Sequence, residues 1–222
     1  MPPFTEVAPI IGAISVCVGR HATGRSVPSS RCQPPLKIFC LKLFLKNLLT
    51  FSHNESILIV SKEIRKGENK MLNKTLVFDM DGTIADLYGV MGWLDDIHAE
   101  NPRPYAIAEP MYDMEILNGT LNLLKANGWR IVVTTWLAKG STKHYDNLVR
   151  MAKLEWLEMH NFPFDEVHMV KYGTTKANCT RKLGGFQILF DDNETIRKGW
   201  NLGATVDANE NILEILMKLL DN

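Results

Sequence analysis

The feature that most constrains the fold is an alternation of short apolar runs with longer segments of helical spacing, which begins near Met71. Four of the runs are rich in aliphatic and β-branched residues and are bounded by Gly, Asp or Asn, as buried strands are. They are KTLVFDMDGT, WRIVVTTW, DEVHMVK and FQILFDD. Strands that alternate with helices at these lengths predict a parallel sheet with helices on both faces.

The segments between these runs predict the helices and loops. Helices are expected at residues 89–101, 114–127 and 141–160, over TKANCTRKLGG, from about Glu194 and from Asn209, with a brief strand near Thr205. The stretch NPRPYAIAEP is predicted to be a loop because prolines punctuate it. In the longest helix, the residues expected to face the core are Tyr145, Leu148, Met151, Leu154 and Leu157.

The predicted fold class is therefore α/β, a three-layer Rossmann-like domain with a parallel sheet. Roughly fifty residues separate the first of these runs from the second, which is enough for a small helical cap but not for a large second domain. We place this domain at residues 71–222 and its cap at about residues 84–128.

Residues 1–70 differ from the rest of the chain in charge. They hold ten Lys and Arg against four Asp and Glu, whereas the remainder holds fifteen against twenty-one. Such asymmetry marks a tail or a boundary. Three interpretations stay open: a poorly structured tail, a transit peptide, or translated sequence upstream of a true start at Met71. The last is favoured because KGENKM back-translates to AAA GGA GAA AAT AAA ATG, which resembles a bacterial ribosome-binding site. A chain that starts at Met71 is then expected to fold and to be active.

Charge and cysteine content limit the partners and the compartment. The acidic second part of the chain argues against binding to a nucleic-acid backbone. The apolar stretch LKIFCLKLFLKNLLTF is interrupted by three lysines and is a poor transmembrane helix, so no membrane partner is expected. Beyond Met71 the only cysteine is Cys179, which excludes a disulfide framework there and favours a reducing, cytoplasmic compartment.

Acidic side chains follow two of the predicted strands. The first strand ends in Asp79 and Asp81, and the fourth ends in Asp191 and Asp192. The carboxyl ends of parallel strands meet at one edge of the sheet, where ligands bind. Carboxylates gathered there repel one another unless a cation is present, and a set of oxygen ligands favours Mg²⁺. The same pattern predicts that Thr134 and Thr135, which end the second strand, lie at this edge.

Three segments together resemble the haloacid dehalogenase superfamily of phosphohydrolases. LVFDMDGTIADL resembles its first motif, RIVVTTW its second and ILFDDNET its fourth, and the resemblance extends over residues 71–222. It implies that Asp79 is a nucleophile that forms an aspartyl phosphate. It also implies that Asp81 is the general acid and base, and that its backbone carbonyl, with Asp79, Asp191 and Asp192, binds Mg²⁺.

The same resemblance implies phosphate-binding residues. Thr134 matches the hydroxyl residue that holds the phosphoryl oxygens, and Thr135 is the alternative. The third motif is a single lysine, for which Lys171, Lys176 and Lys182 are candidates. Lys176 is favoured because it starts the short helix after the third strand, where its ammonium group can point back into the site.

The substrate is less constrained than the reaction. The compact insert resembles that of the 5′(3′)-deoxyribonucleotidases, which implies a nucleoside monophosphate. Four aromatic residues in the insert are candidates for stacking on a base: Tyr88, Trp93, Tyr105 and Tyr112. Alternatively, Trp93 and Tyr112 fill the core of the cap. Asp86 either caps a helix or orients the site.

The predicted function is Mg²⁺-dependent hydrolysis of a small-molecule phosphate monoester, with a nucleotide as the favoured substrate. Two alternatives remain open at this point. One is a phosphotransferase or mutase that acts on sugar phosphates and excludes water from the aspartyl phosphate. The other is a non-catalytic module that binds a phosphorylated ligand, which the presence of both Asp79 and Asp81 disfavours.

Overall fold

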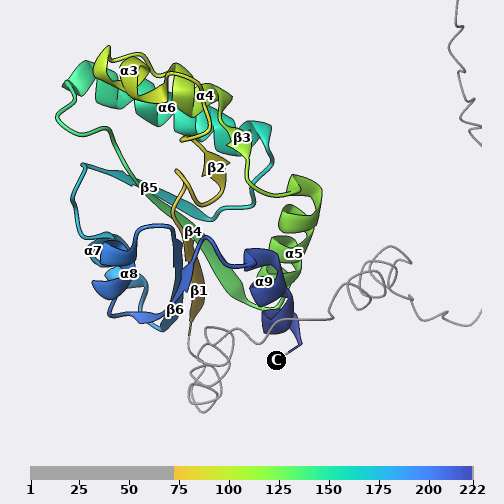
Figure 1. Ribbon diagram of the computed structural model, residues 1–222. Helices are drawn as coiled ribbons and strands as arrows, with labels where there is room; N and C mark the ends of the chain where they lie inside the picture. The colour runs from red at the N-terminus through yellow and green to blue at the C-terminus, as the bar shows by residue number, and fades with distance from the viewer. Residues whose placement is uncertain (1–72, 222) are drawn as a thin grey trace, which may run out of the picture. The chain divides into compact units, whose positions relative to one another are not determined.

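The computed structural model describes residues 73–221. The interpretations of residues 1–70, including a start at Met71, fall outside this range. Within the described range, strands and helices alternate along the chain (Figure 1). None of the helices in that range is long and apolar enough to cross a membrane.

A five-stranded sheet forms the centre of the domain, with the strand order β5-β4-β1-β6-β7. Its strands are β1 (Lys74–Phe78), β4 (Trp129–Trp136), β5 (Glu166–Val170), β6 (Phe186–Asp191) and β7 (Gly203–Asp207). Each neighbouring pair is parallel. The α/β fold class predicted from the alternating pattern is therefore confirmed.

The register of the central strand fixes which residues meet at the edge of the sheet. Phe78 lies opposite Val133 of β4 and Phe190 of β6. The strands run parallel, so the residues that follow these three reach the same edge. These residues are Asp79, Thr134 and Asp191.

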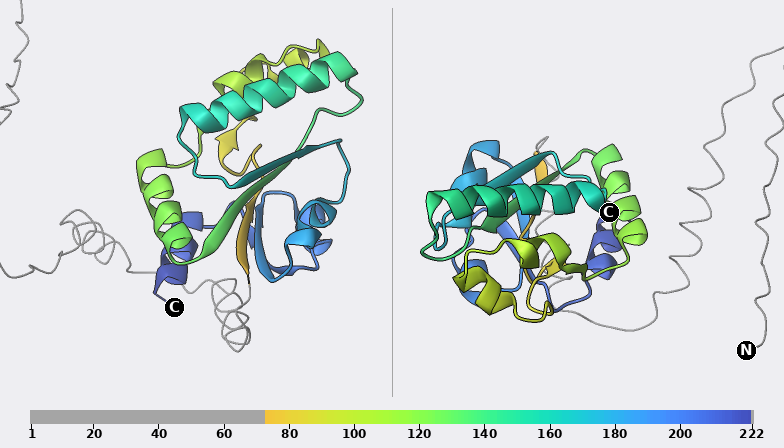
Figure 2. Two further views of the ribbon diagram at one scale, coloured as in Figure 1. Left: turned by 180° about the vertical axis from the view of Figure 1, so that it is seen from behind. Right: turned by 90° about the horizontal axis from the view of Figure 1, so that it is seen from above.

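Helices cover both faces of the sheet (Figures 1 and 2). One face carries α5 (Met114–Ala126), α6 (Lys143–Met159) and α9 (Ile212–Leu220), and the other carries α7 (Lys176–Thr180), the 3₁₀ helix η1 (Arg181–Leu183) and α8 (Glu194–Lys198). Leu76 and Phe78 pack with the first group, whereas Val77 packs with the second. This alternation follows from the two-residue period of a strand.

The predicted loop NPRPYAIAEP contains a helix, α4 (Arg103–Ile107). The prolines do not prevent it, because Pro102 is its N-cap and Pro104 lies in its first turn, where backbone N–H groups need no helical partner. The buried ring of Tyr105 and packing of α4 on α6 then stabilise the turn. The expectation of a loop was wrong because prolines at the start of a helix do not interrupt it, whereas prolines in its interior do.

The predicted cap region, residues 84–128, contributes to two parts of the domain. Its first part holds the short antiparallel strands β2 (Ala85–Asp86) and β3 (Glu109–Pro110), with α3 (Trp93–His98) and α4 between them. In both views of Figure 2, α4 lies alongside α6, and α3 packs against α4. Helix α5, by contrast, packs against α9 and β4 as part of a sheet-covering layer.

The buried stripe of α6 differs from the predicted one. Met151 is 58% exposed and Leu154 is 38% exposed. A spacing of three residues drifts around a helix of 3.6 residues per turn, so the predicted stripe leaves the buried face. Two of the predicted residues, Tyr145 and Leu157, are buried as expected. The other buried residues of the helix are Val149, Ala152, Lys153 and Trp156. A lysine therefore lies in the middle of the buried stripe.

Candidate active site

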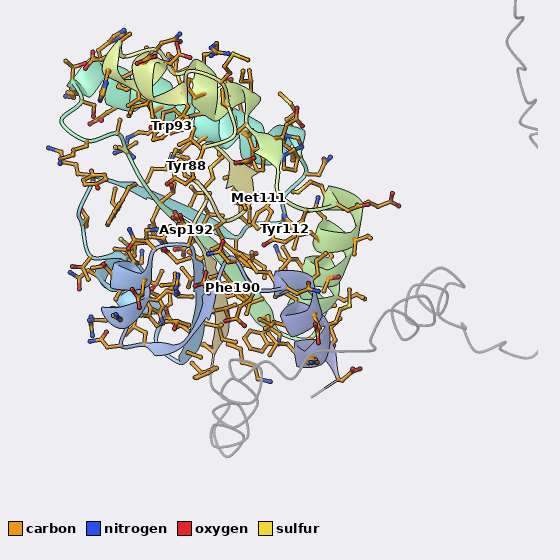
Figure 3. The ribbon with its side chains drawn as sticks, viewed as in Figure 1. Tyr88, Trp93, Met111, Tyr112, Phe190 and Asp192 are labelled. Carbon is orange, nitrogen blue, oxygen red and sulfur yellow. The ribbon has the colours of Figure 1, made fainter. Side chains whose placement is uncertain are left out.

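A cleft with a volume of about 400 Å³ lies at the carboxyl ends of the strands. It is lined by Asp79 and Asp81 after β1, by residues that follow β4, β5 and β6, and by side chains of α3. Figure 3 shows Tyr88 and Trp93 between α3 and the sheet, with Asp192 below them at the edge of the sheet. Open α/β sheets bind their ligands at this edge.

Three carboxylates gather at the floor of the cleft. Asp79, Asp191 and Asp192 each place an oxygen within 4.8 Å of the others. Burial raises the pKa of Asp192 to about 6, and the neighbouring Asp79 carboxylate adds to this shift. Burial and the Asp79 charge also raise the pKa of Asp191. The carboxylates therefore resist being charged together, a conflict that a bound cation relieves.

Lys176 is buried between two of these acids. Its Nζ lies 2.8 Å from Oδ2 of Asp79 and 2.7 Å from Oδ2 of Asp191. Burial alone acts to lower the pKa of Lys176, but the two carboxylates outweigh it and raise the pKa. The other candidates for the third motif, Lys171 and Lys182, are exposed. Of the three lysines, the structure thus brings Lys176 to the acids.

Lys153 of α6 reaches the remaining acid, Asp81. Its Nζ donates to Oδ2 of Asp81 at 2.5 Å, to Oγ1 of Thr135 at 2.7 Å and to the backbone carbonyl of Trp136 at 2.8 Å. Burial raises the pKa of Asp81, and Lys153 only partly offsets this effect. Sequence reasoning missed Lys153. A signal was available, because Lys153 lies four residues after Val149 and three before Trp156, on the apolar side of the helix.

The donor set at the floor of the cleft fits a hard divalent cation. Four carboxylates and two ammonium groups leave a formal charge of −2. Oδ1 of Asp79 is buried and has no hydrogen-bond partner among residues 73–221. Every available ligand is an oxygen, as Mg²⁺ prefers. Both oxygens of Asp191 are already bonded, to Lys176 and to the N–H of Asn193, which leaves Asp192 as the more accessible partner of Asp79.

The two threonines at the end of β4 face opposite sides of the sheet. Thr135 accepts a hydrogen bond from Lys153 on the α6 side. Successive side chains of a strand point to opposite faces of the sheet, so Thr134 lies on the side of α7. Its Oγ1 is buried and has no hydrogen-bond partner within the described part of the chain. Of the two hydroxyls, that of Thr134 is therefore the unpartnered one, but its side chain is fully buried and Thr134 is not among the residues that line the cleft.

The turn after Asp81 requires a glycine. Gly82 has a φ of 73°, and a Cβ there would lie 2.8 Å from Oδ2 of Asp192 and 2.6 Å from Cε2 of Tyr88. The backbone of this turn thus packs directly against Asp192. Asp86, whose role was left open, accepts a hydrogen bond from the backbone N–H of Gly89 at 2.9 Å and closes the following turn.

Three of the four predicted aromatic residues line the cleft: Tyr88, Trp93 and Tyr105. The rings of Tyr88 and Trp93 meet edge to face, with centroids 5.2 Å apart. Tyr112 packs instead against the main core, and its hydroxyl donates to the carbonyl of Ala208. Figure 3 shows Tyr112 beside α5 and α9, away from Trp93.

A second aromatic pair in the cleft was not predicted. Trp136, the last residue of β4, and Tyr172, which follows β5, have ring centroids 4.8 Å apart. Both line the cleft, and Tyr172 is 53% exposed. Their position at the carboxyl ends of two strands was a usable signal. The pair lies outside the insert, so a prediction of stacking residues from the insert does not include it.

Comparisons with known proteins returned few similarities. No protein-family model matches the chain, and no curated protein does. Among solved structures, the chain is similar to a crystal structure of D,D-heptose 1,7-bisphosphate phosphatase from Burkholderia thailandensis. The two share 12% identity over 67% of this chain and 99% of that one, with a TM-score of 0.40. A similarity at this level carries neither an activity nor a substrate to this chain.

Proposed function

We propose that this chain is a Mg²⁺-dependent phosphate monoester hydrolase of the haloacid dehalogenase type, which acts through an aspartyl phosphate on Asp79. The observation that carries the proposal is the environment of the Asp79 carboxylate. Oδ2 is held by Lys176, whereas Oδ1 is buried and finds no partner in residues 73–221. A carboxylate held by one oxygen keeps the other for attack on phosphorus, and the sequence around it resembles the first motif of that family.

The groups that would hold Mg²⁺ are Asp192, the backbone carbonyl of Asp81 and Oδ2 of Asp79, the oxygen that Lys176 also contacts, so Oδ1 of Asp79 stays free for attack. Asp191 would act as their support, because it keeps Lys176 in place beside Asp79. When bound, the ion offsets the negative charge of the phosphoryl oxygens. The ammonium group of Lys176 would offset the same negative charge. The unpaired hydroxyl of Thr134 would donate a hydrogen bond to a phosphoryl oxygen.

In the first step, an oxygen of Asp79 forms a bond to phosphorus and the bond from phosphorus to the leaving oxygen breaks. Asp81 enters this step protonated and gives its proton to the leaving oxygen, so that a neutral alcohol departs. Its raised pKa, which results mainly from burial, favours the protonated form. The products are the free alcohol, the aspartyl phosphate and the Asp81 carboxylate.

In the second step, the Asp81 carboxylate takes a proton from water as the water oxygen attacks phosphorus. The bond between phosphorus and Asp79 breaks, which releases inorganic phosphate and restores both side chains. One residue can serve both steps because each step returns it to the protonation state that the other requires. Two displacements through a covalent intermediate replace one difficult displacement by water.

A nucleoside monophosphate is the favoured substrate. The cleft holds two aromatic pairs, Tyr88 with Trp93 and Trp136 with Tyr172, on different segments of the chain. Both line the same cleft as Asp79, so a phosphate at Asp79 leaves its organic group among aromatic rings. A planar base stacks on such rings with about 1–3 kcal/mol per base.

A phosphate-release screen tests this proposal. The purified chain is assayed against nucleoside monophosphates, sugar phosphates and small phosphoesters, each with Mg²⁺ and with a chelator. We expect turnover that depends on Mg²⁺ and is fastest for a nucleotide. Fastest turnover of a sugar phosphate would overturn the substrate assignment. Turnover of none of the three classes would overturn the proposed hydrolase.

A further inference from the structure

The ammonium group of Lys153 is buried and fully bonded, yet neither of the two chemical steps uses it. Its side chain has no exposed surface, although lysine is among the residues least often buried. A lysine ammonium has three N–H groups, and each has an acceptor: Oδ2 of Asp81, Oγ1 of Thr135 and the carbonyl of Trp136. These three contacts fix the position of Nζ.

The position of Lys153 is also fixed by its place on helix α6 and by contacts with β4 and Tyr105. Lys153 lies between buried Ala152 and Trp156 on the stripe that faces the domain. Its Nζ also lies 4.9 Å from the centroid of the Tyr105 ring, which lines the cleft. Because two of its three acceptors belong to β4, the ammonium group is tied to the sheet independently of Asp81.

We propose that Lys153 is a positioning residue for Asp81, which it holds by Oδ2 so that Oδ1 faces the leaving oxygen of the substrate. This inference rests on the hydrolase proposed above. A carboxyl group that rotates freely presents either oxygen, whereas one bonded to a fixed ammonium group presents a single oxygen. Such positioning matters in the first step, in which the proton must reach the leaving oxygen as its bond to phosphorus breaks.

A comparison of leaving groups separates this role from a purely structural one. The two substrates are 4-nitrophenyl phosphate and the alkyl phosphate that the wild type hydrolyses fastest. Nitrophenolate is a stable anion and leaves without a proton, but an alkoxide needs one. For both substrates, kcat/KM reports the steps up to departure of the leaving group, so hydrolysis of the aspartyl phosphate does not enter the comparison.

We expect that Lys153→Met lowers kcat/KM for the alkyl phosphate by roughly 100-fold, within the range of about 10²–10⁴ for general acid catalysis. For 4-nitrophenyl phosphate the loss is expected to be less than about 10-fold, because that reaction needs no general acid. In an Asp81→Asn background, Lys153→Met is expected to cause no further loss with the alkyl phosphate. A variant whose fold is merely loosened would lose activity on both substrates alike.

The matched control is Lys125→Met on α5, where Lys125 pairs with Asp165 at 2.6 Å, outside the residues that line the cleft. It is expected to keep the wild-type ratio of the two kcat/KM values. If Lys153→Met does not fold, as judged by thermal unfolding, Lys153→Gln takes its place, because its amide can satisfy some of the buried acceptors.

Equal losses on the two substrates, or a further loss in the Asp81→Asn background, would overturn the positioning role. A wild type that hydrolyses neither substrate would instead refute the underlying hydrolase. The two failures are therefore distinguishable in one experiment.

Discussion

The partners of individual oxygens distinguish the four acids of the cleft at the residue scale. Asp79 has one oxygen bonded to Lys176 and one without a partner in the described part of the chain. Both oxygens of Asp191 are bonded, and Oδ2 of Asp81 is bonded to Lys153. Asp192 faces the cleft. These differences support separate roles as nucleophile, support, general acid and metal ligand.

The response of stability to Mg²⁺ tests the role of Asp192. Burial and the neighbouring Asp79 carboxylate raise its pKa from 3.8 to about 6 in the folded protein. A carboxyl group with a raised folded pKa stabilises the fold below its unfolded pKa, and this contribution is lost as the pH rises through the folded pKa. Mg²⁺ requires the deprotonated form. We therefore expect Mg²⁺ to raise Tm above this pKa and to do so much less below it.

The size of this effect follows from binding linkage. A Mg²⁺ concentration of about 100 times Kd stabilises the folded protein by about 2.7 kcal/mol. Thermal unfolding of Asp192→Asn should show most of this gain removed. Asp221→Asn is the matched control, since Asp221 is exposed at the end of α9. A wild-type Mg²⁺ response in Asp192→Asn would contradict its role as a ligand.

Single residues were predictable from sequence where they end a strand. Asp79 and Asp191 follow apolar runs, so the parallel register brings them together. Lys153 was not predictable from such a pattern, because it lies within a helix and its partner Asp81 is 72 residues away. The signal for its burial was its spacing from Val149 and Trp156 on the same side of the helix. The predicted buried stripe ran through Met151 and Leu154 and did not include Lys153.

At the scale of elements, the turn between β1 and β2 carries Asp81 and packs against Asp192. Ile84 and Ala85 both donate their backbone N–H groups to the carbonyl of Met80 at 3.0 Å, and Gly82 donates to the carbonyl of Ala85. The turn is therefore held by its own backbone. Its close approach to Asp192 leaves no space for a side chain at Gly82.

The substitution Gly82→Ala tests this packing. The methyl group would clash with Asp192 and Tyr88, and the left-handed backbone would add strain of about 1–2 kcal/mol. We expect Mg²⁺-dependent activity to fall at least about 10-fold, the equivalent of about 1.4 kcal/mol. Gly128→Ala is the control, because Gly128 has a φ of 83° with nothing within 4 Å of an added Cβ. It should lose stability but keep activity, and a similar loss of activity in both variants would contradict the account.

The helices were predicted less accurately than the strands. The strand runs are short and rich in aliphatic residues, so composition identifies even β5, whose residues are only half-buried. The structure places β1, β4, β5 and β6 where they were expected. Helix α4 has only five residues and begins among prolines, so its sequence is too short to show a periodic pattern of apolar residues. Its stability comes from tertiary packing on α6, which a local pattern does not contain.

At the scale of the whole domain, the cleft combines residues of the cap segment with residues at the strand ends. Tyr88 and Trp93 belong to the cap segment, whereas Trp136 ends β4 and Tyr172 follows β5. The second pair is distant in sequence from the first, so a search of the insert alone identifies only half of the aromatic lining. The aromatic lining of the cleft is therefore a property of the assembled domain.

Removal of an exposed ring tests the nucleotide preference. Tyr172 is 53% exposed, so Tyr172→Ala should cost little stability. If a base stacks on the pair that Tyr172 forms with Trp136, the loss of about 1–3 kcal/mol per base raises KM for a nucleotide by roughly 5- to 150-fold. Ribose 5-phosphate, which has no base, is the control substrate. An equal change in KM for the two substrates would show that the pair does not bind a base.

Detection of a phosphoryl group on Asp79 is the decisive test of the covalent mechanism. The chain is quenched with acid during turnover of 4-nitrophenyl phosphate with Mg²⁺, digested, and analysed by mass spectrometry. Asp81→Asn is included because it should slow hydrolysis of the intermediate and raise its level. We expect a phosphorylated peptide in which the modified residue is Asp79, and neither modification nor turnover in a folded Asp79→Asn variant. Phosphate release by Asp79→Asn at a rate near that of the wild type would contradict the covalent mechanism.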